Sequence, residues 1–128
     1  MEVINLSSTN SSPEVTLDKK KGIFEISGVS FPEDVKDFYR PLINWFKLYF
    51  EEPNEETFLK LKLLYMNTAS SKMIYEIFQL FKLAHKAGIK VNIHWQYNKD
   101  DEQMGDAGED FAILLEGVPF RIEGISIH

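Results

Sequence analysis

The sequence contains no cysteine, and this absence removes several kinds of chemistry. A chain without thiols has no disulfide framework, no thiolate zinc site and no cysteine nucleophile. It also lacks an apolar run of the roughly 20 residues that a membrane-spanning helix needs. Residues 1–13, rich in serine and asparagine, lack the basic flank and apolar core of a signal peptide. We therefore expect a cytoplasmic protein with no membrane partner.

Basic residues are also scarce, which bears on the kind of partner the chain binds. There are 14 of them against 20 acidic residues, giving a net charge of −6. Nucleic-acid-binding proteins usually concentrate lysine and arginine on one face. The only basic run, Lys19–Lys21, precedes Gly22 and is typical of a solvated hairpin turn. We expect no nucleic-acid partner.

Motifs for covalent catalysis and nucleotide binding are missing as well. The sequence has neither a Gly-x-Ser-x-Gly elbow nor a glycine-rich phosphate loop. Its three histidines are scattered: His85 falls in a helical pattern, His94 on the polar side of a strand and His128 at the terminus. The chain is therefore predicted to be neither an enzyme nor a cofactor-binding protein.

The residues that are present suit one globular domain, residues 14–128, behind a flexible leader, residues 1–13. Short β-prone runs at residues 14–17 and 23–27 predict a hairpin. A capping box at Ser30 and Glu33 predicts the start of a helix, and Pro41 within that helix predicts a kink or a short break near residues 39–40.

Hydrophobic periodicity then predicts alternating strands and helices. Residues 57–66 alternate as a strand, with Leu59, Leu61, Leu63 and Tyr65 toward the core. A helix over residues 70–87 is followed by the capping glycine Gly88. The remaining predictions are a strand over 91–97, a short helix over 111–115 and a strand over 120–125. This order predicts an α/β fold with a mixed sheet and with helices packed mainly on one face.

The acidic segment 98–110 partly resembles a calcium-binding loop. Asn98, Asp100, Glu102 and Glu109 occupy positions 1, 3, 5 and 12 of that loop, but Gln103 stands where the turn requires glycine. We expect a solvated acidic loop, with a helix beginning at residues 109–110, and no bound metal. A metal-dependent hydrolase using Asp100, Asp101 and Glu109 remains an alternative that ion-binding measurements would test.

The junction between the strand ending at Met66 and the following helix is the strongest candidate for a functional site. Thr68 and Ser70 lie where the helix begins, and either hydroxyl could serve as the N-cap. Alternatively, Thr68 accepts a phosphoryl group, because a helix N-terminus favours anions and Lys72 follows one turn later. From the residues alone, capping is the commoner reason for a hydroxyl at this position.

A set of spaced motifs from about Ile26 to Ile122 resembles the SiaC family of bacterial regulatory phosphoproteins. The motifs are Tyr65-x-Asn67-Thr68-x-Ser70-Ser71-Lys72, Phe38-Tyr39-x-Pro41, Trp95-x-Tyr97, Asp100-Asp101-x-x-Met104, Gly108-Glu109-Asp110 and Pro119-Phe120. The resemblance implies a phosphorylation switch at Thr68, flanked by Asn67, Ser70, Ser71 and Lys72. It also implies a fold like that of STAS domains and anti-sigma-factor antagonists.

Partners are likewise implied by the resemblance rather than by the residues. They are a serine/threonine protein kinase, a PP2C-type phosphatase and a diguanylate cyclase. The unphosphorylated form is expected to bind and activate the cyclase, promoting cyclic di-GMP synthesis, and phosphorylation is expected to end that contact. The alternative is an anti-sigma-factor-antagonist-like binding module that acts on a transcriptional regulator.

Overall fold

Residues 1–127, the part of the chain that the computed structural model describes, form one six-stranded sheet and three helices. His128, one of the histidines considered above, lies outside the described residues. The elements are β1 (Ile4–Leu6), β2 (Glu14–Asp18), β3 (Ile23–Ser30), α1 (Val35–Tyr49), β4 (Glu56–Met66), α2 (Thr68–Lys86), β5 (Lys90–Asn98), α3 (Glu102–Leu114) and β6 (Phe120–Ile125).

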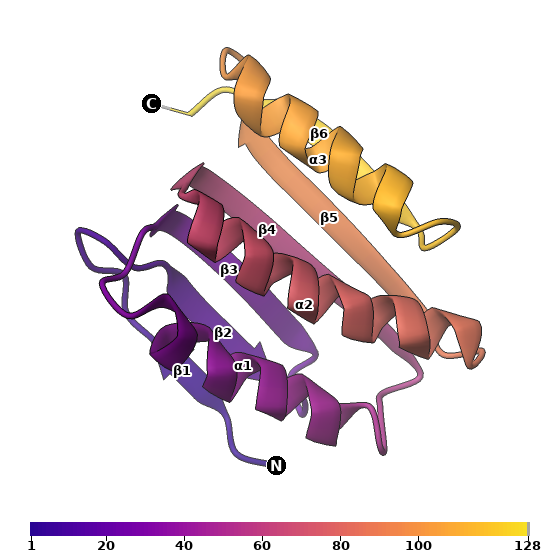
Figure 1. Cartoon of the computed structure of the whole chain (residues 1–128). Coiled ribbons are helices and arrows are strands. Elements are labelled where there is room, and N and C mark those ends of the chain that lie inside the picture. Colours follow the sequence, from indigo (N-terminus) through magenta and orange to yellow (C-terminus); the bar gives the residue numbers. More distant parts are fainter. Residues whose placement is uncertain (128) are drawn as a thin grey trace.

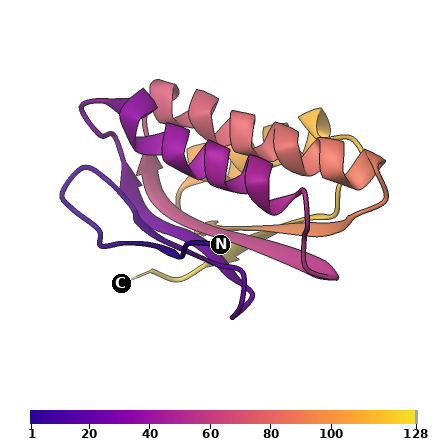
Figure 2. The same cartoon turned by 90° about the horizontal axis from the view of Figure 1, so that it is seen from below.

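The strands lie in the sheet in the order in which they occur in the chain (Figure 1). β1, β2 and β3 are antiparallel neighbours, whereas β3, β4, β5 and β6 run parallel to one another. Each parallel step is made through a helix, and all three helices cover the same face of the sheet (Figure 2). The predicted mixed α/β sheet with helices on one face is therefore confirmed.

The core lies between this helical layer and the sheet. Alternate strand residues, such as Leu59, Leu61 and Leu63 of β4, are almost fully buried beneath the helices. Aromatic rings fill the space under α1, where Trp45 and Tyr49 stack with ring centroids 5.4 Å apart. Burying each such side chain is worth about 1.5–3 kcal/mol, so this layer holds the helices against the sheet. No helix within residues 1–127 has the length and hydropathy needed to cross a membrane.

The N-terminal part of the chain differs from the prediction in two places. Residues 4–6, expected to belong to a flexible leader, instead form β1, which pairs with β2. Ser30, expected to cap α1, is the buried last residue of β3 and pairs with Met66. Asp34 caps the helix instead, its Oδ1 accepting a hydrogen bond of 3.0 Å from the Asp37 N–H.

Pro41 does not break α1, which is helical without interruption from Val35 to Tyr49. The proline removes the donor that would have bonded to the carbonyl of Asp37, one turn earlier. Both Pro41 and Asp37 are exposed, so water can reach that carbonyl. Of the kink or short break predicted near residues 39–40, the break is therefore wrong, because the lost hydrogen bond falls on the solvent side of the helix; the kink stays a prediction.

A β-bulge at the end of β4 changes which side chains reach the core. Gly28 of β3 lies opposite Leu63, whereas the next residue, Val29, lies opposite Tyr65, so Leu64 has no partner in the ladder. Tyr65 is consequently 51% exposed, where strict alternation predicts a buried side chain. Its ring instead packs edge-on against that of Phe31, at a centroid distance of 5.8 Å.

The segment predicted to be a solvated acidic loop is largely helical. α3 begins at Glu102 rather than at residues 109–110, because Asp101 caps it by accepting from the Met104 N–H at 3.2 Å. Its glycines let it approach the sheet closely: a Cβ built on Gly108 would lie 2.5 Å from Trp95 Cδ1. These glycines are packing residues rather than loop residues.

Candidate functional site

Thr68 is the first residue of α2, and its side chain is exposed. β4 ends at Met66, so a single residue, Asn67, separates the strand from the helix. Pairing between β3 and β4 continues to the last residue, where Ser30 lies opposite Met66. The sheet therefore holds the start of α2, and with it Thr68, in a fixed position.

Asn67 is the N-cap of α2. Its Oδ1 accepts a hydrogen bond of 2.8 Å from the Ser70 N–H, and its own N–H donates to the carbonyl of Ser30 at 3.0 Å. We expected Thr68 or Ser70 to cap the helix, and this expectation is wrong. The amide side chain reaches the N3 position from just outside the helix, as a cap must. The Thr68 hydroxyl is thus not used to hold the helix end.

The three hydroxyls of the segment differ in their access to solvent. Thr68 is exposed, Ser71 is half-buried and Ser70 is fully buried. The Ser70 Oγ accepts a hydrogen bond of 2.8 Å from Ser30 Oγ. An enzyme that modifies this segment can therefore reach Thr68 without disturbing the fold, whereas Ser70 is committed to the interior.

A buried tyrosine extends this interior network to α1. The hydroxyl of Tyr39 lies 2.5 Å from Ser30 Oγ, and burial raises the pKa of Tyr39 to about 12. Since Ser30 has one hydroxyl proton and gives it to Ser70, the neutral Tyr39 donates to Ser30. This chain of hydrogen bonds ties α1, the end of β3 and the first turn of α2 together, reaching α2 at Ser70, two residues after Thr68.

A groove of about 530 Å³ runs beside Thr68, between the first turns of α1 and α2. Apolar side chains line part of it, and three charged side chains and the Thr68 hydroxyl line the rest. The lining residues are Val35 and Lys36 of α1 together with Thr68, Ala69, Lys72, Met73 and Glu76 of α2. The site is therefore a shallow surface between two helices, suited to contact with another macromolecule.

The electrostatics around Thr68 favour a negative charge. The first turn of α2 contains no acidic residue. Capping by Asn67 satisfies the Ser70 N–H, and the N–H groups of Thr68 and Ala69 have no intrahelical acceptor because they open the helix. Together with the helix dipole and the nearby Lys36 and Lys72, these donors would stabilise an anionic group on Thr68.

Residues 6–125 match the SiaC family of regulatory phosphoproteins, which accounts for nearly the whole chain. The chain belongs to the SiaC family. A relative from Pseudomonas aeruginosa strain UCBPP-PA14, an uncharacterised protein, is 29% identical over 111 residues, which are 87% of this chain and 88% of the relative. The resemblance inferred from the spaced motifs is thereby confirmed.

Solved structures of SiaC from Pseudomonas aeruginosa have the same fold. Apo-SiaC is 27% identical, with a TM-score of 0.89 over 97% of this chain and 100% of that one. A second structure holds SiaC as the activator of the diguanylate cyclase SiaD. The matching chain of that complex is 28% identical to this chain, with a TM-score of 0.88 over 95% of this chain and 99% of that one. The likeness to STAS domains stays a prediction.

The acidic residues of this SiaC-family chain do not form a calcium-binding loop. Asp101 is used as a helix cap, and Glu102 and Glu109 lie on the exposed side of α3. A calcium loop would need these residues to curl around one point, which a continuous helix prevents. Within residues 1–127, no three histidine, aspartate or glutamate side chains gather as metal ligands.

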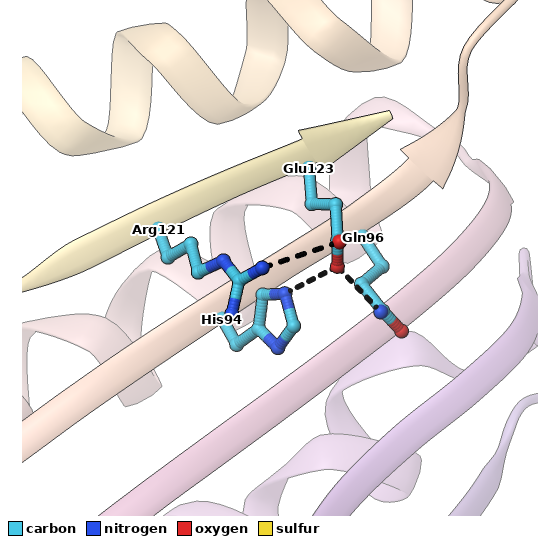
Figure 3. Close-up of polar contacts among 4 residues, drawn as sticks. All are labelled: His94, Gln96, Arg121 and Glu123. Carbon is cyan, nitrogen blue, oxygen red and sulfur yellow. Dashed lines mark hydrogen bonds and ion pairs between the residues drawn. The ribbon is translucent and has the colours of Figure 1, made fainter. Parts of the chain in front are cut away.

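His94 belongs to a polar cluster on the open face of the sheet (Figure 3). Glu123 Oε1 accepts from Gln96 Nε2 at 2.8 Å and lies 2.9 Å from His94 Nε2, while its Oε2 accepts from Arg121 at 3.2 Å. The hydrogen bonds from Gln96 and His94 lower the pKa of Glu123. This cluster joins β5 to β6 and lies on the opposite side of the sheet from Thr68.

Sequence reasoning found half of the site. Asn67, Thr68, Ser70, Ser71 and Lys72 all lie at the predicted junction, and the capping role alone differs from expectation, because Asn67 rather than Thr68 or Ser70 is the N-cap. The α1 side of the groove, Val35 and Lys36, was missed. No local pattern indicates that these two residues face Thr68, because only the packing of α1 against α2 brings them there.

Proposed function

We propose that this protein is a phosphorylation-controlled activator of a diguanylate cyclase, acting by binding rather than by catalysis. In the unphosphorylated form it binds the cyclase and promotes cyclic di-GMP synthesis. Phosphorylation of Thr68 by a serine/threonine protein kinase ends the contact, and a PP2C-type phosphatase restores it. The observation that carries the proposal is an exposed Thr68 hydroxyl, left free by the Asn67 cap, in a chain of the SiaC family.

A solved structure of a relative supports the choice of a diguanylate cyclase as the partner. SiaC of Pseudomonas aeruginosa is the activator of SiaD, and its fold matches this chain over 95% of the residues. Thr68 also borders the groove between α1 and α2, so a phosphate there would change a surface that a partner can contact. A phosphate adds a charge of about −1.5 to −2 at neutral pH. Binding would then be controlled by charge at the surface.

The phosphorylation site can be tested directly by mass spectrometry. Incubation with the cognate kinase and ATP should place one phosphate on Thr68, and Thr68→Ala should remove it. Ser71→Ala, which deletes the half-buried hydroxyl one turn away, serves as the matched control and should be phosphorylated normally. A phosphate found only on another residue would refute the assignment.

The activating function is tested with the diguanylate cyclase encoded in the same genome. Addition of the unmodified protein should raise the rate of cyclic di-GMP synthesis, and Thr68→Ala should do the same. Thr68→Asp should bind the cyclase more weakly, because its carboxylate places a negative charge at the groove. Equal affinities for the two variants would contradict control by charge.

A further inference from the structure

Charge is unevenly distributed between the helices of this acidic chain. α1 and α2 carry six basic residues, Lys36, Arg40, Lys47, Lys72, Lys82 and Lys86, against the two acidic residues Asp37 and Glu76. α3, by contrast, carries four acidic residues and no basic one. In a protein with a net charge of −6, the surface formed by α1 and α2 is therefore locally positive.

Acidic neighbours offset the positive charge of this surface only in part: Asp34 interacts electrostatically with Lys36 and Asp37 with Arg40, in neither case as a close ion pair. The ion pair in residues 1–127 joins Arg121 to Glu123, which also hydrogen-bonds with His94, on the opposite side of the sheet. None of the six basic side chains of α1 and α2 forms an ion pair in that part of the chain. All of them except Lys82 are exposed, and Lys82 is half-buried. Lys82 Nζ donates to the carbonyl of Leu114 at 3.1 Å, whereas Lys36 and Lys72 remain available to a partner.

The groove beside Thr68 lies within this positive surface and combines two kinds of contact. Val35, Ala69 and Met73 supply apolar contacts, and Met73 is 8% exposed. Among the charged lining residues, Lys36 borders the groove from α1, and Lys72 and the single acidic residue Glu76 border it from α2. An amphipathic segment whose apolar side chain is flanked by carboxylates would complement both features.

We propose that the groove between α1 and α2 binds an acidic amphipathic segment of the partner protein. This inference rests on the proposed function, which supplies the diguanylate cyclase as that partner. The partner's carboxylates pair with Lys36 and Lys72, and an apolar side chain contacts Val35, Ala69 and Met73. Electrostatic attraction between the positive helices and an acidic segment also accelerates association.

The same arrangement explains how a phosphate on Thr68 would end binding. The phosphate would lie on the edge of the groove, within the field of Lys36 and Lys72, and would compensate the charges that otherwise attract the partner. It would also repel the partner's carboxylates directly. The phosphate on Thr68 would thus take the place of the partner's carboxylates beside Lys36 and Lys72.

Charge reversal at Lys36 tests the inference. Lys36 lies on α1, so the substitution changes the charge of the groove and leaves the sequence around Thr68 unaltered. Binding of Lys36→Glu to the cyclase is measured by surface plasmon resonance at several salt concentrations. We expect the association rate to fall about tenfold, with a weaker dependence on salt, because a charge at the edge of an interface acts mainly on association. Lys36→Gln should give a smaller reduction in the same direction.

Lys62→Glu is the matched control, since it makes the same change of net charge on the exposed side of β4. It should bind the cyclase like the unmodified protein. If Lys36→Glu also binds normally, or if both variants lose affinity equally, the acidic-segment inference is overturned while the proposed function stands. If the unmodified protein fails to bind the cyclase at all, both are overturned.

A second copy of the chain, presenting its acidic α3, is the competing occupant of the groove. Analytical ultracentrifugation separates the two cases. We expect the unmodified protein and Lys36→Glu to sediment identically. A dimer that Lys36→Glu dissociates would assign the groove to self-association and overturn the inference.

Discussion

Asn67 and Thr68 are adjacent residues with different tasks at the start of α2. The amide of Asn67 holds the helix end through the Ser70 N–H, while the hydroxyl of Thr68 remains exposed to solvent. A phosphoacceptor that was also the cap would lose a stabilising hydrogen bond on modification. In the proposed switch the cap and the phosphoacceptor are separate residues, so phosphorylation of Thr68 would change the surface charge without loosening the helix.

This division predicts unequal effects of two neighbouring substitutions. Asn67→Ala should lower the free energy of unfolding by about 1 kcal/mol, because the cap is lost. Thr68→Ala should change it by less than about 0.5 kcal/mol, because the side chain is exposed and not the cap. Urea denaturation monitored by circular dichroism measures both. Equal losses would show that Thr68 shares the capping role.

The buried tyrosine beneath the site predicts a dependence of stability on pH. Burial raises the pKa of Tyr39 from 10.0 to about 12, so the folded protein keeps it protonated while the unfolded chain ionises near pH 10. Its stabilising effect is therefore complete below pH 10 and is lost between pH 10 and pH 12. At about 1.36 kcal/mol per pKa unit, roughly 1.4 kcal/mol is lost at pH 11.

Tyr39→Phe isolates this contribution, since the other titrating groups are common to both proteins. The free energy of unfolding is measured at pH 9 and at pH 11 for each. The unmodified protein should lose about 1.4 kcal/mol more than Tyr39→Phe over that interval. Parallel losses in the two proteins would mean that Tyr39 titrates normally.

At the scale of the elements, α3 owes its position to glycine. Gly108 lies against Trp95, which is fully buried and donates from Nε1 to the carbonyl of Met104 at 2.9 Å. A side chain at position 108 would push the helix away from the sheet. The glycines at 105 and 108 look like loop residues in the sequence because their reason for being glycine lies on another element.

Gly108→Ala should therefore destabilise the protein, against the usual order of helix propensities. Alanine is better than glycine by about 1 kcal/mol in an exposed helix, but crowding of the fixed Trp95 should cost about 1–3 kcal/mol. Gly105→Ala is the comparison, because its Cβ would lie 2.9 Å from Cε2 of Tyr97, which is only half-buried and can yield. Urea denaturation should show the larger loss for Gly108→Ala; a gain in stability would refute the packing argument.

Elements with strong hydrophobic periodicity could be predicted from the sequence, and those defined by tertiary contacts could not. The pattern of Met73, Ile74, Ile77 and Phe81 indicates α2, and its ending at Gly88 agrees with the positive φ of 88° found there. The exposure of Tyr65 could not be predicted, because the bulge that causes it depends on how β3 and β4 pair. The capping of α1 by Asp34 could not be predicted for a similar reason: pairing with β4 holds Ser30 in the sheet, so that Ser30 cannot cap the helix.

The candidate site divides in the same way. The strand-to-helix junction that contains Thr68 follows from local periodicity, and the choice of Thr68 as the switch came from the spaced motifs of the family. Lys36 joins the site only through the packing of α1 against α2. Sequence reasoning therefore located the proposed phosphoacceptor, Thr68, but not the surface that its phosphate would change.

At the scale of the whole molecule, the fold separates a positive helical surface from the rest of an acidic protein. The α1–α2 pair that carries the positive charge also contains Thr68, and the hydrogen bonds from Tyr39 through Ser30 to Ser70 tie these two helices to the sheet. A charge placed on Thr68 is thus presented on a rigid support. The expected response to phosphorylation is a change of surface potential, with the core left as it is.

This rigidity predicts that the phosphorylated protein is at least as stable as the unmodified one. An anion at the N-terminus of a helix is worth about 0.3–1 kcal/mol at low ionic strength, so the unfolding midpoint should stay constant or rise slightly after complete phosphorylation. Amide chemical shifts measured by NMR should change at residues 67–72 and at Val35 and Lys36, and should stay constant in β5 and β6. A lower unfolding midpoint, with shifts that change throughout the sheet, would mean that phosphorylation acts by unfolding the domain. The cyclase would then be released because its binding surface is lost, and charge at the groove would not be the cause.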